Sequence, residues 1–114
     1  MKILVVDDEA SLRDIAKTYL EAHGHEVVTA ADGVEAVSLF RHAEVDFDFV
    51  LTDYQMPRMN GVVLLMELKK LSPATRVALY SADPPRRDIE RYIGEIPVLE
   101  KPVSLKKILE VVQG

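Results

Sequence analysis

Short apolar runs alternate along the chain with stretches whose apolar residues recur at helical spacing. The runs have the length of β-strands, and several of them are rich in valine, isoleucine, leucine or aromatic residues. They span residues 2–6, 26–30, 47–52, 76–80 and 96–99. The hydrophobic pattern therefore predicts five strands.

Five helices are predicted between and after these strands. Asp32 and Ser104 are typical N-caps for the second and fifth helices, and the third is expected to begin near Asn60-Gly61. His23-Gly24 can end the first helix, and Pro84-Pro85 suit the first turn of a short fourth one. Helical periodicity places the following residues on faces that are expected to be buried: Leu12, Ile15, Ala16, Tyr19, Leu20, Val34, Val37, Val62, Leu65, Met66, Leu68, Leu105, Ile108, Leu109 and Val112.

Strands that alternate with helices are typical of a parallel sheet covered by helices on both faces. Consecutive parallel strands need crossovers of a dozen or more residues, and the helical segments supply them. The predicted fold class is therefore α/β, with a doubly wound five-stranded parallel sheet. In such folds ligands bind at the carboxyl ends of the strands, so the chemistry of this chain is expected there.

Composition narrows the class of protein further. The 114 residues leave room for one domain, and a content of 48% hydrophobic and 29% charged residues is ordinary for a globular one. The absence of cysteine excludes disulfides and thiolate metal sites. A formal charge of -5 argues against a surface for duplex nucleic acid. The apolar run 3–6 is too short for a signal peptide or a membrane span, so a cytoplasmic location is expected.

Polar side chains follow four of the five predicted strands. Asp7 and Asp8 follow the first strand, Asp53 the third, Ser81 the fourth and Lys101 the fifth. Each one alone has an ordinary explanation, because acidic and hydroxyl residues are common in turns and helix caps. A parallel sheet, however, brings the carboxyl ends of its strands to one edge. The five side chains are therefore expected to converge.

Three carboxylates in one pocket need a cation. At about 4 Å and an effective dielectric constant of about 20, each like-charged pair costs about 4 kcal/mol. Oxygen ligands with room for water suit Mg2+ rather than zinc. A carboxylate beside Mg2+ is a competent nucleophile toward a phosphoryl group. Lys101 and Ser81 are then expected to stabilise the phosphoryl oxygens by charge and by a hydrogen bond.

The strand ends carry a set of specific motifs: Ile3-Leu4-Val5-Val6-Asp7-Asp8-Glu9, Thr52-Asp53 followed by Met56-Pro57 and Asn60-Gly61, Ser81-Ala82, and Lys101-Pro102. With these motifs the sequence resembles the receiver domains of two-component response regulators, the CheY-like family. The resemblance covers essentially the whole chain, so residues 1–114 are expected to form one receiver domain. It implies a flavodoxin-like (βα)5 sheet with strand order 2-1-3-4-5, an order that CheY exemplifies.

The resemblance also implies roles for the acidic residues. Asp53 would be the phosphoacceptor. Asp8, Asp53 and the backbone carbonyl of Gln55 would bind Mg2+ directly, and Asp7 would act through a water. The domain would not be an enzyme in its own right, although it would catalyse its own phosphorylation and dephosphorylation.

Partners follow from the same resemblance. Ser81 and Lys101 would contact the phosphoryl group, and the Lys101-Pro102 peptide bond would be cis. The donor would be a phosphohistidine on a sensor histidine kinase or a histidine phosphotransfer protein. A downstream protein partner, or an output domain outside this chain, would receive the signal, so the chain is either a stand-alone receiver or part of a longer regulator. No contact with nucleic acid or a membrane is expected of this domain.

Two departures from the family pattern concern the output. The position three residues before Lys101, where receiver domains usually carry an aromatic residue, is Val98. The segment from Ser81 to Lys101 is slightly shorter than usual, and it contains Pro84-Pro85 and Arg86-Arg87. Because valine has little surface and one stiff torsion, we expect activation to rearrange residues 82–87 and the start of the fourth helix instead.

Two other classes of protein could carry a similar cluster of residues. A phosphatase of the haloacid dehalogenase type needs a second aspartate two residues after the nucleophile, where this chain has Gln55. It also needs an acidic group after the lysine, and the only acid beyond Lys101 is Glu110. A pseudo-receiver that binds partners without taking phosphate is the other alternative. The intact acidic cluster, Ser81 and Lys101 favour the acceptor over both.

Overall fold

A computed structural model describes all 114 residues as five strands and five helices in strict alternation. The strands are β1 (Lys2–Val6), β2 (Glu26–Ala30), β3 (Phe49–Asp53), β4 (Arg76–Ser81) and β5 (Val98–Glu100). The helices are α1 (Ala10–Ala22), α2 (Gly33–Arg41), α3 (Gly61–Leu71), α4 (Arg86–Tyr92) and α5 (Leu105–Gln113). The predicted alternation is confirmed, although β3 and β5 each begin two residues later than the hydrophobic pattern indicated. No helix combines the length and the apolar character that crossing a bilayer requires.

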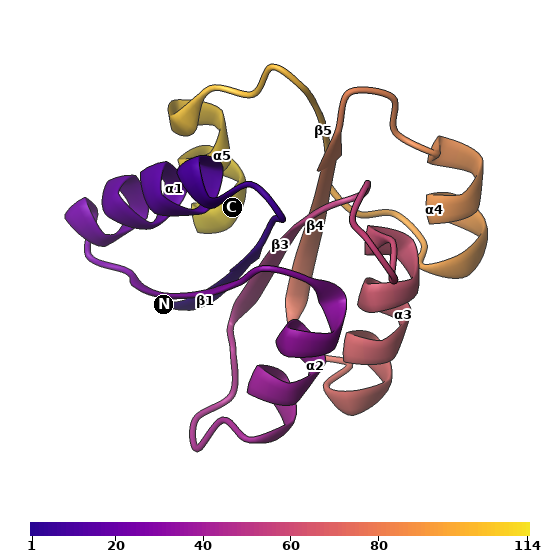
Figure 1. The fold of residues 1–114 in the computed structure, drawn as a ribbon, viewed down its shortest axis with the longest axis horizontal. Helices are drawn as coiled ribbons and strands as arrows, with labels where there is room; N and C mark the ends of the chain where they lie inside the picture. The colour runs from indigo at the N-terminus through magenta and orange to yellow at the C-terminus, as the bar shows by residue number, and fades with distance from the viewer.

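The five strands form one sheet in which every neighbouring pair is parallel, in the order β2-β1-β3-β4-β5. This confirms the predicted doubly wound topology. The pairing sets Asp53 beside Tyr80 and Ser81 beside Glu100. The loops that follow β4 and β5 lie at the same edge of the sheet (Figure 1). The strand ends that carry the polar side chains are thus neighbours in space.

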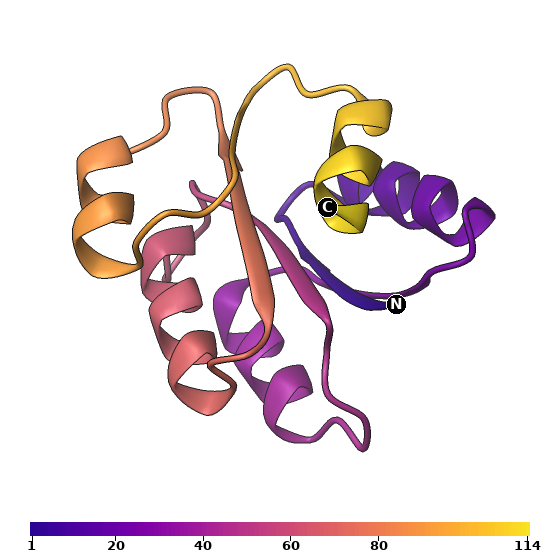
Figure 2. The ribbon, with the colours of Figure 1, turned by 180° about the vertical axis from the view of Figure 1, so that it is seen from behind.

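Helices cover both faces of the sheet, α1 and α5 on one face and α2, α3 and α4 on the other (Figures 1 and 2). Side chains alternate between these faces along each strand. In β1, Ile3 and Val5 pack toward α1 and α5, whereas Leu4 and Val6 pack toward the other helices. Both faces are buried, which explains why the strands appear in the sequence as continuous apolar runs.

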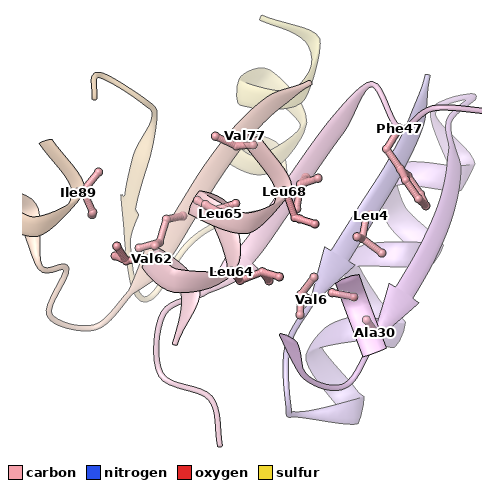
Figure 3. Close-up of a cluster of buried hydrophobic side chains, with 13 residues drawn as sticks. Leu4, Val6, Ala30, Phe47, Val62, Leu64, Leu65, Leu68, Val77 and Ile89 are labelled. Carbon is pink, nitrogen blue, oxygen red and sulfur yellow. The ribbon is translucent and has the colours of Figure 1, made fainter. Parts of the chain in front are cut away.

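Each face has its own apolar core. The core under α2, α3 and α4 is drawn in Figure 3, where Val62, Leu65 and Leu68 of α3 reach toward the strands. The core under α1 and α5 includes Leu20, Phe49 and Ile108. Removing these side chains from water stabilises the fold and holds the sheet between its two helical layers.

The second, third and fifth helices start where the sequence predicted. The side chains of Asp32, Asn60 and Ser104 each accept a hydrogen bond from the backbone N–H three residues later, at 2.8, 3.0 and 3.0 Å. These bonds satisfy N–H groups that have no partner within the helix. The fourth helix begins at Arg86 with Pro85 as its N-cap residue, so Pro84-Pro85 precede the first turn instead of lying in it as predicted.

Three of the residues expected to be buried are exposed. Val34 is 54% exposed, because α2 turns the small residues Gly33 and Ala36 toward the sheet instead. Leu12 and Ile15 are 37% and 50% exposed. They line a hollow between α1 and the start of α5, so the N-terminal half of the apolar stripe of α1 is only partly covered.

Candidate functional site

Three carboxylates meet at the carboxyl edge of the sheet. Asp7 and Asp8 follow β1, Asp53 is the last residue of β3, and oxygens from all three lie within 4.8 Å of one another. Asp7 and Asp53 are buried, with 0% and 4% exposure, whereas Asp8 faces solvent. The three carboxylates therefore lie close together, as the sequence predicted.

Lys101 supplies the positive charge of the site. Its Nζ lies 3.3 Å from Oδ2 of Asp53, and its backbone N–H donates to the carbonyl of Ser81 at 2.9 Å. That backbone bond continues the pairing of β4 with β5 and fixes where the lysine leaves the sheet. The peptide bond between Lys101 and Pro102 is cis, as predicted.

Ser81 ends the strand next to that of Asp53, and Gln55 lies two residues after Asp53, but the two residues differ in exposure. Ser81 ends β4 and is buried, and its Oγ accepts a hydrogen bond from the Asp83 N–H at 3.1 Å. This bond leaves the Ser81 hydroxyl proton available for donation. Gln55 lies in the loop after β3 with an exposed side chain, so its main chain is the part that borders the site.

Burial raises the pKa of Asp53, and the nearby charge of Asp7 raises it further. Lys101 lowers the same pKa by its charge and its hydrogen bond, and the backbone amide of Gln55 also lowers it, but the increase prevails. The ionised form of Asp53 is therefore held at an energetic disadvantage. A cation among the three carboxylates would remove that disadvantage.

Tyr80 is a part of the site that sequence reasoning missed. Its hydroxyl donates a hydrogen bond to Oδ2 of Asp7, and the Nζ of Lys101 lies 4.9 Å from the centre of its ring. Burial, followed by the contact with Asp7, raises the pKa of Tyr80, so the phenol keeps its proton and remains a donor. The sequence held one clue to this role. Tyr80 directly precedes Ser81 in a predicted strand, so its side chain points to the opposite face of the sheet from that of the serine.

Main-chain contacts also hold Asp7 and Asp53. Arg13 Nη1 donates to the backbone carbonyl of Asp7 at 2.7 Å, a second contact that the sequence did not reveal. On the other face, the Gly61 N–H donates to the carbonyl of Tyr54 at 2.9 Å. A methyl group at Gly61 would collide with the carbonyl oxygen of Asp53, so only glycine fits there.

The donor set of this edge suits a hard divalent cation. It consists of carboxylate and backbone oxygens, with no histidine or cysteine among the clustered groups. Mg2+ binds such oxygens, usually through one or two carboxylates, and it retains several waters. Asp7 already accepts two hydrogen bonds, one on each carboxylate oxygen, which favours an indirect contact for this residue. The residues present therefore fit Mg2+.

Comparison with known proteins gives a consistent result. A family model described as the response regulator receiver domain matches residues 3–113. A probable transcriptional regulator ycf27 of Cyanophora paradoxa is 39% identical over 108 residues, which are 94% of this chain and 44% of that protein. The corresponding protein of Porphyridium aerugineum is 37% identical over 108 residues, again 94% of this chain and 44% of the relative. The chain thus spans less than half of the length of these relatives.

Solved structures resemble the fold over nearly its full length. Chemotaxis protein CheY4 of Vibrio cholerae is 30% identical, with a TM-score of 0.87, and the match covers 98% of this chain and 95% of that one. The response regulator protein TrrA of Thermotoga maritima, solved in complex with Mg2+ and BeF, is 28% identical. Its TM-score is 0.85, and the match covers 98% of this chain and 96% of that one.

Proposed function

This chain belongs to the response regulator receiver domains of two-component phosphorelay signalling, and from that premise we propose that Asp53 is its phosphoacceptor. One observation carries the proposal. Asp53 is buried at the end of a central strand, with the ammonium of Lys101 at 3.3 Å and two further carboxylates within 4.8 Å. No other acidic side chain of the chain has such surroundings, and we propose that residues 1–114 act as one receiver domain.

In the proposed reaction, a carboxylate oxygen of Asp53 attacks the phosphorus of a phosphohistidine. The new oxygen–phosphorus bond forms as the phosphorus–nitrogen bond breaks, and the electron pair of the broken bond remains on the imidazole nitrogen. Lys101 balances the negative charge of the phosphoryl oxygens, and the Ser81 hydroxyl donates a hydrogen bond to one of them. Because these groups belong to the receiver itself, it would catalyse its own phosphorylation and, with water as the attacking group, its dephosphorylation.

Mg2+, when bound, would supply the positive charge that allows a negatively charged phosphoryl group to approach the carboxylates. Asp8, Asp53 and the backbone carbonyl of Gln55 are the groups that would hold it, with Asp7 acting through an intervening water. The raised pKa of Asp53 and the oxygen-only cluster support this assignment.

The partners in this proposal follow from the reaction. The phosphoryl donor would be a sensor histidine kinase or a histidine phosphotransfer protein, and the site would operate in the cytoplasm. The recipient of the signal would be a downstream protein or an output domain outside the residues described. The net charge of -5 supports a protein partner rather than nucleic acid for this domain.

The direct test is phosphorylation by acetyl phosphate. With Mg2+, the parent chain should gain one labile phosphoryl adduct in its intact mass, and EDTA should prevent it. Asp53→Asn should remove the adduct completely, whereas the matched control Asp14→Asn, at an exposed position of α1, should retain it. An adduct of full strength on Asp53→Asn would show that another residue is the acceptor. A parent chain without any adduct would identify a pseudo-receiver, and continued release of phosphate at a high rate would identify a phosphatase.

A further inference from the structure

Tyr80 connects β4 to the acidic cluster. The residue pairs with Asp53 of the neighbouring strand and is 7% exposed, and its hydroxyl donates to Oδ2 of Asp7. A buried tyrosine needs a partner for its hydroxyl, and a backbone carbonyl satisfies that need as well as a side chain does. Here the partner is a carboxylate of the functional site, 73 residues away in the sequence.

The hydrogen bond from Tyr80 completes the fixation of Asp7. Oδ1 of Asp7 accepts a hydrogen bond from the Glu9 N–H at 2.9 Å, and Oδ2 accepts one from the Tyr80 hydroxyl. One donor on each oxygen restricts rotation of the carboxylate, and bonds to an ionised acceptor are stronger than bonds between neutral groups. Without the phenol, one oxygen of a fully buried carboxylate would lose its donor.

The ring of the same tyrosine contacts Lys101. The Nζ of Lys101 lies 4.9 Å from the centre of the ring while it pairs with Asp53 at 3.3 Å. An ammonium over an aromatic face is attracted by the ring electrons, more strongly where water is partly excluded, and the Lys101 side chain is 27% exposed. Tyr80 therefore touches both the carboxylate cluster and the lysine that faces the acceptor.

We propose that Tyr80 is a positioning residue of the phosphoryl-transfer site, orienting Asp7 through its hydroxyl and Lys101 through its ring. The proposal rests on the function proposed for Asp53. Its two parts are separable, because phenylalanine removes only the hydroxyl, whereas leucine removes the hydroxyl and the aromatic face. Asp7 acts on metal binding, and Lys101 acts on the phosphoryl group, so the two variants should change different quantities.

The experiment measures two quantities for each variant, the Kd for Mg2+ by calorimetry and the rate of adduct formation from acetyl phosphate at saturating Mg2+. Tyr80→Phe should raise the Kd about ten-fold, the usual effect of losing a group that orients a metal ligand, and leave the saturated rate unchanged. Tyr80→Leu should raise the Kd equally and lower the saturated rate about three-fold, since Lys101 loses its aromatic contact. Tyr92→Phe, at a half-exposed position of α4, is the control and should change neither quantity.

A purely structural role predicts another result. If Tyr80 only stabilised the fold, both variants should have a lower melting temperature in EDTA, and the Kd of the folded protein for Mg2+ should be unchanged. A Kd for Tyr80→Phe within about two-fold of the parent would overturn the link to Asp7. Equal saturated rates for Tyr80→Phe and Tyr80→Leu would overturn the link to Lys101. A parent chain that takes up no phosphoryl group would instead reject the proposed function itself.

A double variant tests whether Tyr80 acts through Asp7. In an Asp7→Ala background, Tyr80→Phe should have no further effect on the Kd, and an additional ten-fold loss would contradict the proposal. If Tyr80→Phe does not fold, fluorotyrosine-labelled protein provides the test. Asp7→Ala should shift the resonance of one buried tyrosine, and Mg2+ should shift the same resonance in the parent chain. A tyrosine that responds to neither change would overturn the assignment.

Discussion

The two faces of the sheet hold Asp53 by different means. Toward α1 and α5, Asp7, Tyr80 and Lys101 are linked to one another and to the Asp53 carboxylate, next to a hollow of about 460 Å3 with mainly apolar walls. Toward α3, the first residue of the helix, Gly61, lies so close to the main chain of Asp53 that a methyl group has no room. One face thus provides polar side-chain contacts and the other provides close backbone packing.

This difference separates how the main chain of Asp53 is held in the fold from how the charge of its carboxylate is controlled. The main chain of Asp53 is fixed by contact with α3, where any added atom must displace backbone. The charge on its carboxylate is governed by burial and by the charged groups of Lys101 and Asp7 on the opposite face. Substitutions on the α3 side should therefore affect mainly the free energy of unfolding, whereas substitutions of the carboxylates should affect mainly the response to Mg2+ and pH.

The largest effect is expected from Gly61→Ala. The added methyl group meets the carbonyl oxygen of Asp53 and the Cα of Tyr54, and overpacking of this kind costs about 2–3 kcal/mol. Gly33→Ala is the matched control, because there the nearest atom to the methyl group is the sulfur of the flexible Met59 side chain rather than backbone, and the expected loss is below about 1 kcal/mol. Urea unfolding in EDTA measures both. Equal losses for the two variants would remove the distinction between the faces.

A smaller effect is expected from Mg2+. At ten times its Kd, the ion should raise the free energy of unfolding of the parent chain by about 1.4 kcal/mol, and the melting temperature by about 5 °C. Asp8→Ala should reduce this gain, because a carboxylate of the cluster is lost, while Asp88→Ala on α4 should leave it intact. A parent chain whose melting is indifferent to millimolar Mg2+ would show that the cluster is not a metal site.

Asp53→Asn should stabilise the Mg2+-free chain in a pH-dependent way. The folded pKa of Asp53 is raised, chiefly by burial, so its contribution to stability is present below its ordinary value of 3.8 and is lost as pH rises through the folded pKa. Above the folded pKa, the amide replaces a disfavoured buried charge. Melting in EDTA should therefore show Asp53→Asn above the parent at pH 8, with the gap closing toward pH 4. A variant that is less stable than the parent at pH 8 would contradict this electrostatic reading.

The smallest effects concern the output. Val98 is half-buried against the core on the α3 side of the sheet, and it has no aromatic ring. Near the end of β5, Arg86 Nη2 forms an ion pair with Glu100 Oε1 at 2.6 Å. Both charged side chains are more than half exposed, so Arg86→Ala should change stability by less than about 0.5 kcal/mol.

Activation should nevertheless rearrange the segment that Arg86 belongs to. Structures or amide chemical shifts with and without Mg2+ and beryllofluoride should show the main change in residues 82–87 and the start of α4. A main change around Val98, with residues 82–87 unmoved, would reject this route of output.

Much of the architecture was predictable because its causes are local. Asp32, Asn60 and Ser104 cap helices through bonds that span three residues, and such bonds are readable from sequence spacing. The strands were recognisable as apolar runs because both of their faces are buried. The failures at Leu12, Ile15 and Val34 have one origin. Periodicity identifies an apolar side of a helix, but it does not tell how the neighbouring elements cover that side.

The sequence by itself determined the alternation of elements and, through the geometry of parallel sheets, the edge at which Asp7, Asp53 and Lys101 meet. Only the tertiary structure decided that Tyr80 holds Asp7, and that Gly61 leaves no space beside Asp53. The first contact joins residues that are 73 positions apart and depends on strand register, and the second depends on the depth at which α3 packs against the end of β3. Local patterns of hydrophobicity, capping and turn residues carry no information about either quantity.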